Sequence, residues 1–205
     1  MIAIVDYGMG NLRSVQKAFE KMGNSAEIVD TPANVEKAAA VVLPGVGAFA
    51  DAMAQLKSRG MDKALRDAID AGKPFLGVCL GLQLLFEQSF EDGQHEGLGV
   101  LSGSVRQLSG GVKIPHMGWN RLQARKRSPL LKGTPEDCYF YFVHSYVVEP
   151  TDPDVVLTTT EYAGEFVSGV EKDNVTAFQF HPEKSGDCGL NILRNFGKLA
   201  AARRS

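Results

Sequence analysis

The 205-residue sequence has little of what marks several protein classes. It contains no apolar run near the ~20 residues needed to cross a bilayer, so no transmembrane segment is expected. The net charge at pH 7 is only −2, which predicts neither a nucleic acid nor an anionic membrane as a partner. The three cysteines are odd in number and far apart, which argues against a disulfide framework and predicts a reducing cytoplasm as the location.

The composition is that of an ordinary globular protein, with 44% apolar and 22% charged residues, and the length predicts a single domain, residues 1–205. In the first half, short apolar runs alternate with segments whose apolar residues recur every three or four positions. The expected strands are residues 2–5, 26–29, 40–43 and 75–78. The expected helices are residues 11–22, a short one from 31–32, a longer region broken near 60 and ending at 72, and one from 80.

The second half is richer in closely spaced strands. They are expected at residues 100–105, 139–143, 146–148, 155–160, 165–170 and 175–180. A final helix is expected at 189–202, and residues 114–120 are expected to be irregular. Because apolar strands separated by helices form parallel sheets covered on both faces, the predicted fold is α/β and doubly wound, with a mixed extension of the sheet.

The most informative motif is Gly-Val-Cys-Leu-Gly at residues 77–81, between an apolar run and an amphipathic segment. This order predicts a strand, a sharp turn and a helix, with Cys79 exposed at the turn as a nucleophile. A helix N-terminus favours a thiolate there, and the backbone amide of Leu80 is placed to face an oxyanion. A buried cysteine in an ordinary turn is the alternative interpretation.

A nucleophilic cysteine needs a base, and His181 is the best of the four histidines. It follows a good strand, which delivers it to the sheet edge that presents Cys79. Pro182 keeps His181 extended, and Glu183 is placed to accept a hydrogen bond from the imidazole. A turn histidine beside a solvated glutamate is the alternative.

Two other chemistries fit the sequence less well. A zinc site lacks a Cys-x-x-Cys motif and any second, closely spaced pair of ligands. A dinucleotide fingerprint begins with glycines at positions 8 and 10, but its third glycine falls at Arg13.

Residues 77–81 with Gln83, the Pro-Gly-Val-Gly run at 44–47 and His-Pro-Glu at 181–183 together resemble the triad, or class I, glutamine amidotransferases. The resemblance covers nearly the whole chain. It implies a flavodoxin-like mixed sheet flanked by helices, and a glutaminase that uses no cofactor and no metal. Residues 6–11, 115–120 and 142–146 resemble one branch of the family, whose members dock on a (β/α)8-barrel cyclase subunit.

The resemblance also implies a role for individual residues. Cys79 attacks the side-chain amide of L-glutamine, His181 transfers the protons, and Glu183 orients His181. The oxyanion donors are the backbone amides of Leu80 and Val46. The positions that match substrate contacts are Gly45, Gln83, Ser145 and Tyr146.

The same resemblance implies that ammonia passes directly to the partner, since ammonia released into water is protonated and is no longer nucleophilic. The expected docking face consists of Met9, Gly10, Asn11, Ser14, Met117, Trp119, Asn120 and Lys184. Because residues 45–47 include two glycines, we expect the Val46 amide to face away from the oxyanion until the partner signals. The basic run at 125–127 is interpreted as a solvated loop.

Three alternatives stay open. The first is another triad glutaminase, of the pyridoxal phosphate synthase or anthranilate synthase type. The second is a catalytically silent binding module of the same fold, against which the intact set of Cys79, His181 and Glu183 argues. The third is a flavodoxin-like nucleotide binder, against which the missing third glycine argues.

Overall fold

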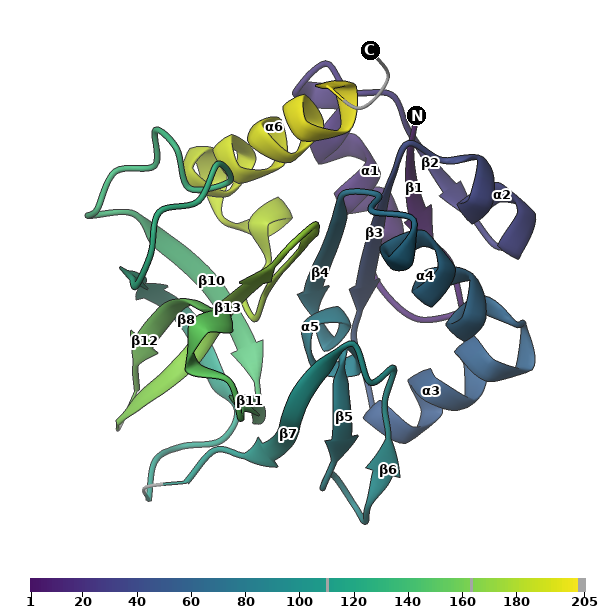
Figure 1. Cartoon of the computed structure of the whole chain (residues 1–205). Coiled ribbons are helices and arrows are strands. Elements are labelled where there is room, and N and C mark those ends of the chain that lie inside the picture. Colours follow the sequence, from purple (N-terminus) through teal and green to yellow (C-terminus); the bar gives the residue numbers. More distant parts are fainter. Residues whose placement is uncertain (110, 163, 203–205) are drawn as a thin grey trace.

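The computed structural model describes residues 1–109, 111–162 and 164–202, and it has a large mixed sheet with helices on both faces (Figure 1). Five strands run parallel in the spatial order β2 (Ala26–Val29), β1 (Ile2–Val5), β3 (Ala40–Gly45), β4 (Phe75–Cys79) and β14 (Val175–Phe178). The doubly wound α/β fold predicted from the sequence is therefore confirmed.

From β14 the sheet continues mainly with antiparallel pairs. The order is β13 (Glu165–Lys172), β11 (Tyr146–Pro150), β7 (Leu101–Gln107), β5 (Phe86–Ser89) and β6 (His95–Glu96), with β5 parallel to β7. Strand β12 (Val156–Glu161) pairs with β13, and β9 (Gln123–Ala124) pairs with β12. Strands β8 (His116–Arg121) and β10 (Tyr139–His144) form a separate antiparallel pair.

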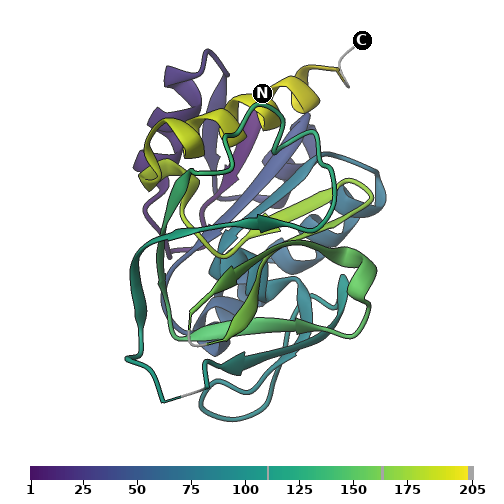
Figure 2. The same ribbon diagram turned by 90° about the vertical axis from the view of Figure 1, so that its left-hand side faces the viewer.

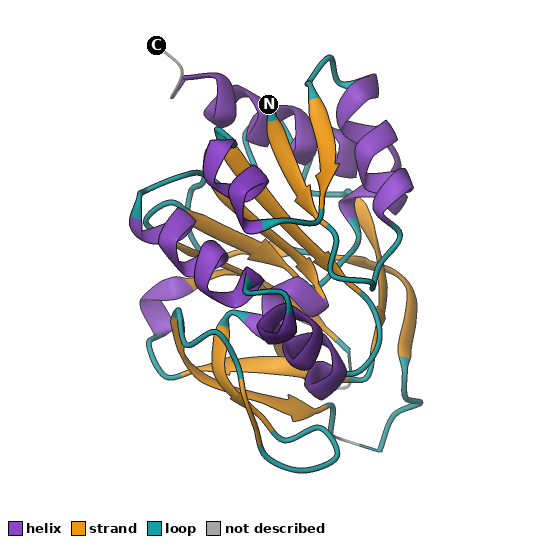
Figure 3. Cartoon of the chain, turned by 90° about the vertical axis from the view of Figure 1, so that its right-hand side faces the viewer, coloured by secondary structure: helices purple, strands orange, loops and turns teal. Residues whose placement is uncertain are grey.

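The helices bury opposite faces of the parallel strands. Helices α2 (Pro32–Lys37), α3 (Phe49–Ser58) and α4 (Met61–Asp70) cover one face (Figure 3), and α1 (Leu12–Lys21) and α6 (Gly186–Ala202) cover the other. The side chains of strand β1 alternate between these two layers. Ala3 and Val5 pack with α2, α3 and α4, and Ile2 and Ile4 pack with α1 and α6. Such strands are apolar on both faces, which made them easy to recognise in the sequence.

Strands β8, β10, β12 and β13 gather on the side of the molecule away from α2, α3 and α4 (Figures 1 and 2). The expectation that residues 114–120 are irregular was wrong, because residues 116–121 form β8. The strand is hard to recognise because its polarity is inverted. Its apolar Met117 and Trp119 are exposed, at 62% and 56%, whereas His116 is buried.

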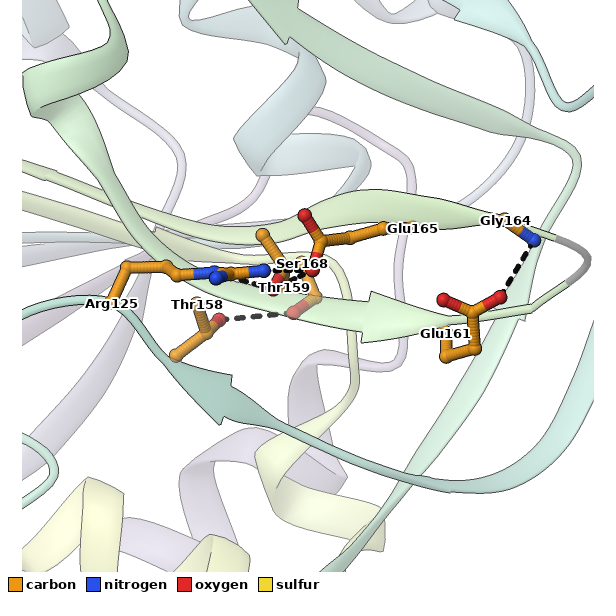
Figure 4. A network of polar contacts seen from close by, with 7 residues as sticks. All are labelled: Arg125, Thr158, Thr159, Glu161, Gly164, Glu165 and Ser168. Atoms are coloured by element: carbon orange, nitrogen blue, oxygen red, sulfur yellow. Dashed lines mark hydrogen bonds and ion pairs between the residues drawn. The ribbon is translucent and has the colours of Figure 1, made fainter.

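A polar network holds β9, β12 and β13 together (Figure 4). The Arg125 guanidinium donates to Thr159 and to the Glu165 carboxylate, which also accepts from Thr159. The hydroxyls of Thr158 and Ser168 are hydrogen-bonded at 3.0 Å. The basic run 125–127 is thus not wholly a solvated loop, since Arg125 bonds to its own sheet, and the Lys126 ammonium donates to two backbone carbonyls.

The cysteine expectation was also wrong. Cys138 and Cys188 form a disulfide, with Cα atoms 6.1 Å apart and a sequence separation of 50. Sequence spacing could not reveal the pair because it depends on α6 packing beside β10. Cys79 is the free cysteine among the described residues.

None of the helices within the described ranges has the length and apolar composition needed to cross a membrane. That residues 1–205 form one domain stays a prediction from length. The helix expected from residue 80 is α5 (Leu80–Leu84), which is followed at once by β5.

Candidate active site

The parallel strands β1, β3, β4 and β14 bring their carboxyl ends to one edge of the sheet, where sites form in doubly wound folds. Cys79 is the last residue of β4 and has φ 55° and ψ −110°, a conformation that non-glycine residues rarely adopt. The turn is therefore strained, as the motif predicted.

The glycines on either side of Cys79 make this turn possible. A Cβ at residue 81 would lie 1.8 Å from the Leu43 carbonyl oxygen, and a Cβ at residue 77 would lie 2.8 Å from Ala177 Cβ. Only glycine permits such close approach of neighbouring backbone. The pentad is thus required by packing at the elbow.

His181 and Glu183 form the pair that the sequence predicted. His181 Nδ1 lies 2.9 Å from Glu183 Oε1, and the two side chains are 4% and 2% exposed. The His181 backbone N–H donates to the Tyr141 carbonyl, which fixes the turn that carries the ring. The other ring nitrogen, Nε2, is buried and has no hydrogen-bond partner of ordinary geometry among the described residues, so it is available for chemistry.

The electrostatics of His181 depend on Cys79 as well as Glu183. Burial lowers the pKa of His181, but hydrogen bonding and charge interaction with Cys79 and Glu183 outweigh burial and raise it to about 9. At neutral pH this favours the imidazolium form of His181. The interaction joins the three residues that the sequence singled out.

A cavity of about 330 Å³ opens onto Cys79. Among the residues predicted to bind substrate, Gln83, Ser145 and Tyr146 line it, and so do both predicted oxyanion residues, Val46 and Leu80. A larger cavity, of about 1060 Å³, lies beside residues 121–138 and has neither Cys79 nor His181 in its wall. The smaller cavity is therefore the candidate substrate site.

Gly45 lies under the wall of the cavity rather than on it. It is buried, and a Cβ there would lie 2.3 Å from the Tyr7 hydroxyl oxygen and 3.0 Å from Leu80 Cβ. The Tyr7 hydroxyl donates to the Pro44 carbonyl at 3.0 Å, and burial raises the pKa of Tyr7, so the donor stays protonated. Tyr7 thus anchors the start of the loop that carries Val46.

Sequence reasoning missed two residues of this site. Glu91 lines the cavity, and its carboxylate accepts a hydrogen bond from the Phe49 backbone N–H at 2.7 Å. Gln179 is fully buried, and its side-chain amide nitrogen lies 3.7 Å from Cys79 Sγ. Position 179 precedes His181 by two, so an extended chain could have suggested it. No pattern in the sequence pointed to Glu91.

The predicted docking residues fall into two groups. Met117 and Trp119 project outward from β8, and the Trp119 ring packs on Tyr141, beside the Lys184 ammonium. Asn120 projects to the opposite face of the strand, where its amide donates to the Glu161 carbonyl.

The second group lies at the N-terminal end of α1. Asn11 is exposed there, while Met9, Gly10 and Ser14 are half-buried. The Met9 methyl packs against Gly47, next to Val46. Met9 therefore connects this second group to the oxyanion loop.

A buried pair of histidines adjoins the cavity, and one of them, His144, lines it. His116 Nδ1 and His144 Nε2 are 2.9 Å apart, and His144 Nδ1–H donates to the Tyr146 carbonyl at 3.0 Å. Burial lowers the pKa of His116 to about 4 and that of His144 to about 3. Both rings are therefore neutral at pH 7.

This pair makes the fold sensitive to acid. An unfolded histidine has a pKa of about 6.5, so below pH 6.5 the unfolded chain binds more protons and stability falls with decreasing pH. At pH 5 we expect each histidine to cost about 2 kcal/mol of unfolding free energy. Urea unfolding at pH 7 and pH 5 measures this decrease in unfolding free energy. The control His95→Gln, at a histidine outside the pair, should leave the decrease unchanged.

His181 affects the pH dependence of stability in the opposite direction. Its raised pKa contributes stability that is complete below pH 6.5 and is lost as pH rises towards 9. The comparison between pH 7 and pH 5 is therefore dominated by the buried pair. Equal unfolding free energies at the two pH values would contradict the neutral assignment.

A cysteine on a strained strand–helix turn, beside a His–Glu pair at the edge of a doubly wound sheet, is an arrangement typical of enzymes that transfer acyl groups through a thiol. The family model described as "Glutamine amidotransferase class-I" matches residues 3–199, and the chain belongs to this family. Curated relatives named "Imidazole glycerol phosphate synthase subunit HisH" include those of Aquifex aeolicus, 56% identical over 96% of this chain and 96% of the relative, and Moorella thermoacetica, 51% identical over 97% and 94%.

Solved structures agree on the fold. A structure titled as a glutamine amidotransferase superposes with a TM-score of 0.77 at 21% identity, covering 98% of this chain and 100% of that one. The structure of PurLQS from Thermotoga maritima gives a TM-score of 0.73 at 19% identity, covering 100% of this chain and 98% of that one.

Proposed function

We propose that this chain is the glutaminase subunit of imidazole glycerol phosphate synthase, which hydrolyses L-glutamine to L-glutamate and ammonia in histidine biosynthesis. The observation that carries the chemistry is the buried His181–Glu183 pair, which interacts with Cys79 at the wall of a cavity of about 330 Å³. The family and the relatives' names support the choice of reaction. A cytoplasmic location stays a proposal, and the Cys138–Cys188 disulfide removes the cysteine argument for it.

The first half of the proposed reaction forms a thioester. The Cys79 sulfur bonds to the side-chain carboxamide carbon of glutamine, and the carbonyl electron pair moves onto oxygen. The backbone amides of Leu80 and Val46 are the proposed oxyanion donors. When the oxyanion collapses, the C–N bond breaks and the His181 imidazolium gives its proton to the departing nitrogen, which leaves as ammonia.

The second half releases glutamate. Neutral His181 takes a proton from water, the hydroxide oxygen bonds to the thioester carbon, and the C–S bond breaks. Glu183 keeps the imidazole in the orientation that points Nε2 at the reacting atoms. The cycle restores the thiolate–imidazolium pair.

The cavity walls offer complementary groups for glutamine. Gln83 presents its side-chain oxygen, because its nitrogen is committed to the Tyr146 carbonyl and to Gln179. Glu91 adds a carboxylate, which we assign to the α-ammonium group. Ser145 and Tyr146 line the same wall, and Gly45 supports it from below.

The proposed partner is a (β/α)8-barrel cyclase subunit that receives the ammonia. Its docking face is the exposed strip of Met117 and Trp119 with Lys184, and the N-terminal segment 9–14. Exposed aromatic and methionine side chains of this kind are enriched at interfaces. Met9 connects this face to the oxyanion loop through Gly47, which gives docking a route to Val46.

We expect weak glutaminase activity from the chain alone and much stronger activity with the barrel subunit and its phosphoribulosyl-formimino carboxamide nucleotide. The expected increase is at least about 100-fold, because gaining or losing one oxyanion donor changes kcat by about that factor. Glutamate release is measured with the chain alone, with the barrel alone added, and with both additions. Equal turnover in all three would reject this partner and its signal.

Trp119→Ala should lose most of the stimulation, because it removes the largest exposed ring of the docking face. Lys63→Ala is the matched control. Lys63 is an exposed residue that pairs with Asp67 on α4, and this helix lies across the sheet from β8. A Trp119→Ala chain that is stimulated as strongly as Lys63→Ala would place docking elsewhere.

A further inference from the structure

Gln179 occupies a position that the proposed triad does not explain. It lies between the end of β14 and His181, and its side chain is fully buried. Its side-chain oxygen is 3.2 Å from Gln83 Nε2, and its side-chain nitrogen is 3.7 Å from Cys79 Sγ. A buried primary amide against a reacting sulfur is a strong local dipole in a region of low dielectric.

The orientation of this amide follows from one backbone carbonyl. The Tyr146 carbonyl oxygen can only accept, so the Gln83 atom 3.2 Å from it is the NH₂ nitrogen. The second hydrogen of that NH₂ group points at Gln179, which must therefore present its oxygen there. The remaining Gln179 group, its NH₂, then faces the sulfur.

The other side of the sulfur carries an acceptor. The Val143 carbonyl oxygen lies 3.9 Å from Cys79 Sγ, where it can accept from the neutral thiol but repels a thiolate. The Gln179 NH₂ group has the opposite preference, since a hydrogen bond to a charged acceptor is stronger than one to a neutral acceptor. The balance between these two neighbours helps to set how readily the sulfur ionises.

We propose that Gln179 is a further residue of the catalytic machinery, whose side-chain amide donates to the Cys79 sulfur and stabilises the attacking thiolate. The assignment rests on the proposed glutaminase function for its role in turnover. The hydrogen bond itself acts in the free enzyme, before glutamine enters. Gln83 is the residue that locks the amide in the donating orientation.

The test is the pH dependence of Cys79 alkylation by iodoacetamide, followed by mass spectrometry in the full chain. Gln179→Leu removes the donor, and Gln179→Glu keeps the shape but replaces the NH₂ group by a carboxylate oxygen. In both variants we expect the acid-side inflection to rise by about one pH unit, which makes alkylation about tenfold slower below it. The shift should be larger for Gln179→Glu, which also adds a charge.

Turnover gives a second readout. We expect kcat for glutamine to fall about tenfold with KM within about twofold, because the amide touches the sulfur and not the cavity. Asn195→Leu is the control: this buried amide on α6 donates to the Leu130 and Lys132 carbonyls, and its loss should lower stability without moving the inflection. If Gln179→Leu does not fold, Gln179→Glu decides the question.

Other titratable groups near the sulfur are His181 and Tyr7, with His144, Glu91 and Tyr146 around the cavity. All are present in both variants, so the comparison with the unaltered chain isolates residue 179. An unchanged inflection in folded Gln179→Leu and Gln179→Glu would overturn the proposal. A shifted inflection in a chain that never hydrolyses glutamine would overturn the proposed function and leave the hydrogen bond standing.

Discussion

Cys79→Ala abolishes glutamine hydrolysis, with an expected fall in kcat of about 10⁴-fold or more, because no other residue lining the cavity carries a thiol that could form the thioester. The sulfur is the sole reacting atom that the substitution removes. Alanine tolerates φ 55° no worse than cysteine does, since both carry a single Cβ, so the strained elbow should persist. The loss is therefore chemical and not structural.

Glutamate release measures the loss, and thermal unfolding and size-exclusion chromatography with the barrel subunit show that fold and docking are kept. Cys138→Ala with Cys188→Ala is a matched control, because it removes the other two sulfurs and leaves Cys79 in place. A Cys79→Ala chain that retains a rate near that of the unaltered enzyme would show that Cys79 is not the nucleophile.

Glu183→Gln has the second largest expected effect, a fall in kcat of about 10²–10⁴-fold. The carboxylate accepts from His181 Nδ1–H, whereas an amide can present its NH₂ group there and select the wrong tautomer. The substitution also removes the negative charge that, with Cys79, raises the pKa of His181 to about 9. The imidazolium is then lost at lower pH.

The pH profile of kcat/KM separates this from simple misfolding. Because the raised pKa keeps His181 protonated up to about pH 9, the alkaline limb of the unaltered enzyme's profile should lie near that value. In Glu183→Gln the alkaline limb should move to lower pH. Glu136→Gln, on an exposed residue outside the site, is the control. An unmoved alkaline limb would contradict the role given to Glu183.

The site was predictable where chemistry imposes a fixed order on neighbouring residues. Residues 77–81 need glycine on both sides of Cys79 for steric reasons, and Glu183 follows His181 by two positions in the short 3₁₀ turn after β14. The parallel strands were equally clear, because both of their faces are apolar. Family membership is confirmed, while the role of each site residue stays a proposal.

What could not be predicted depends on contacts between distant segments. Strand β8 exposes Met117 and Trp119 and buries His116, so at these three positions its pattern is the reverse of an ordinary surface strand. The orientation of the Gln179 amide is fixed by Gln83 and Tyr146, which lie in two other elements of the fold. The bridge from Cys138 to Cys188 likewise joins residues that no local pattern connects.

That bridge has a topological consequence. It closes residues 138–188 into a covalent ring that carries His181, Glu183, Gln179 and the Ser145–Tyr146 wall, whereas Cys79 lies outside the ring. One peptide-bond cleavage anywhere inside the ring leaves a single connected molecule, in which His181 is still covalently joined, from one side, to the scaffold that holds Cys79.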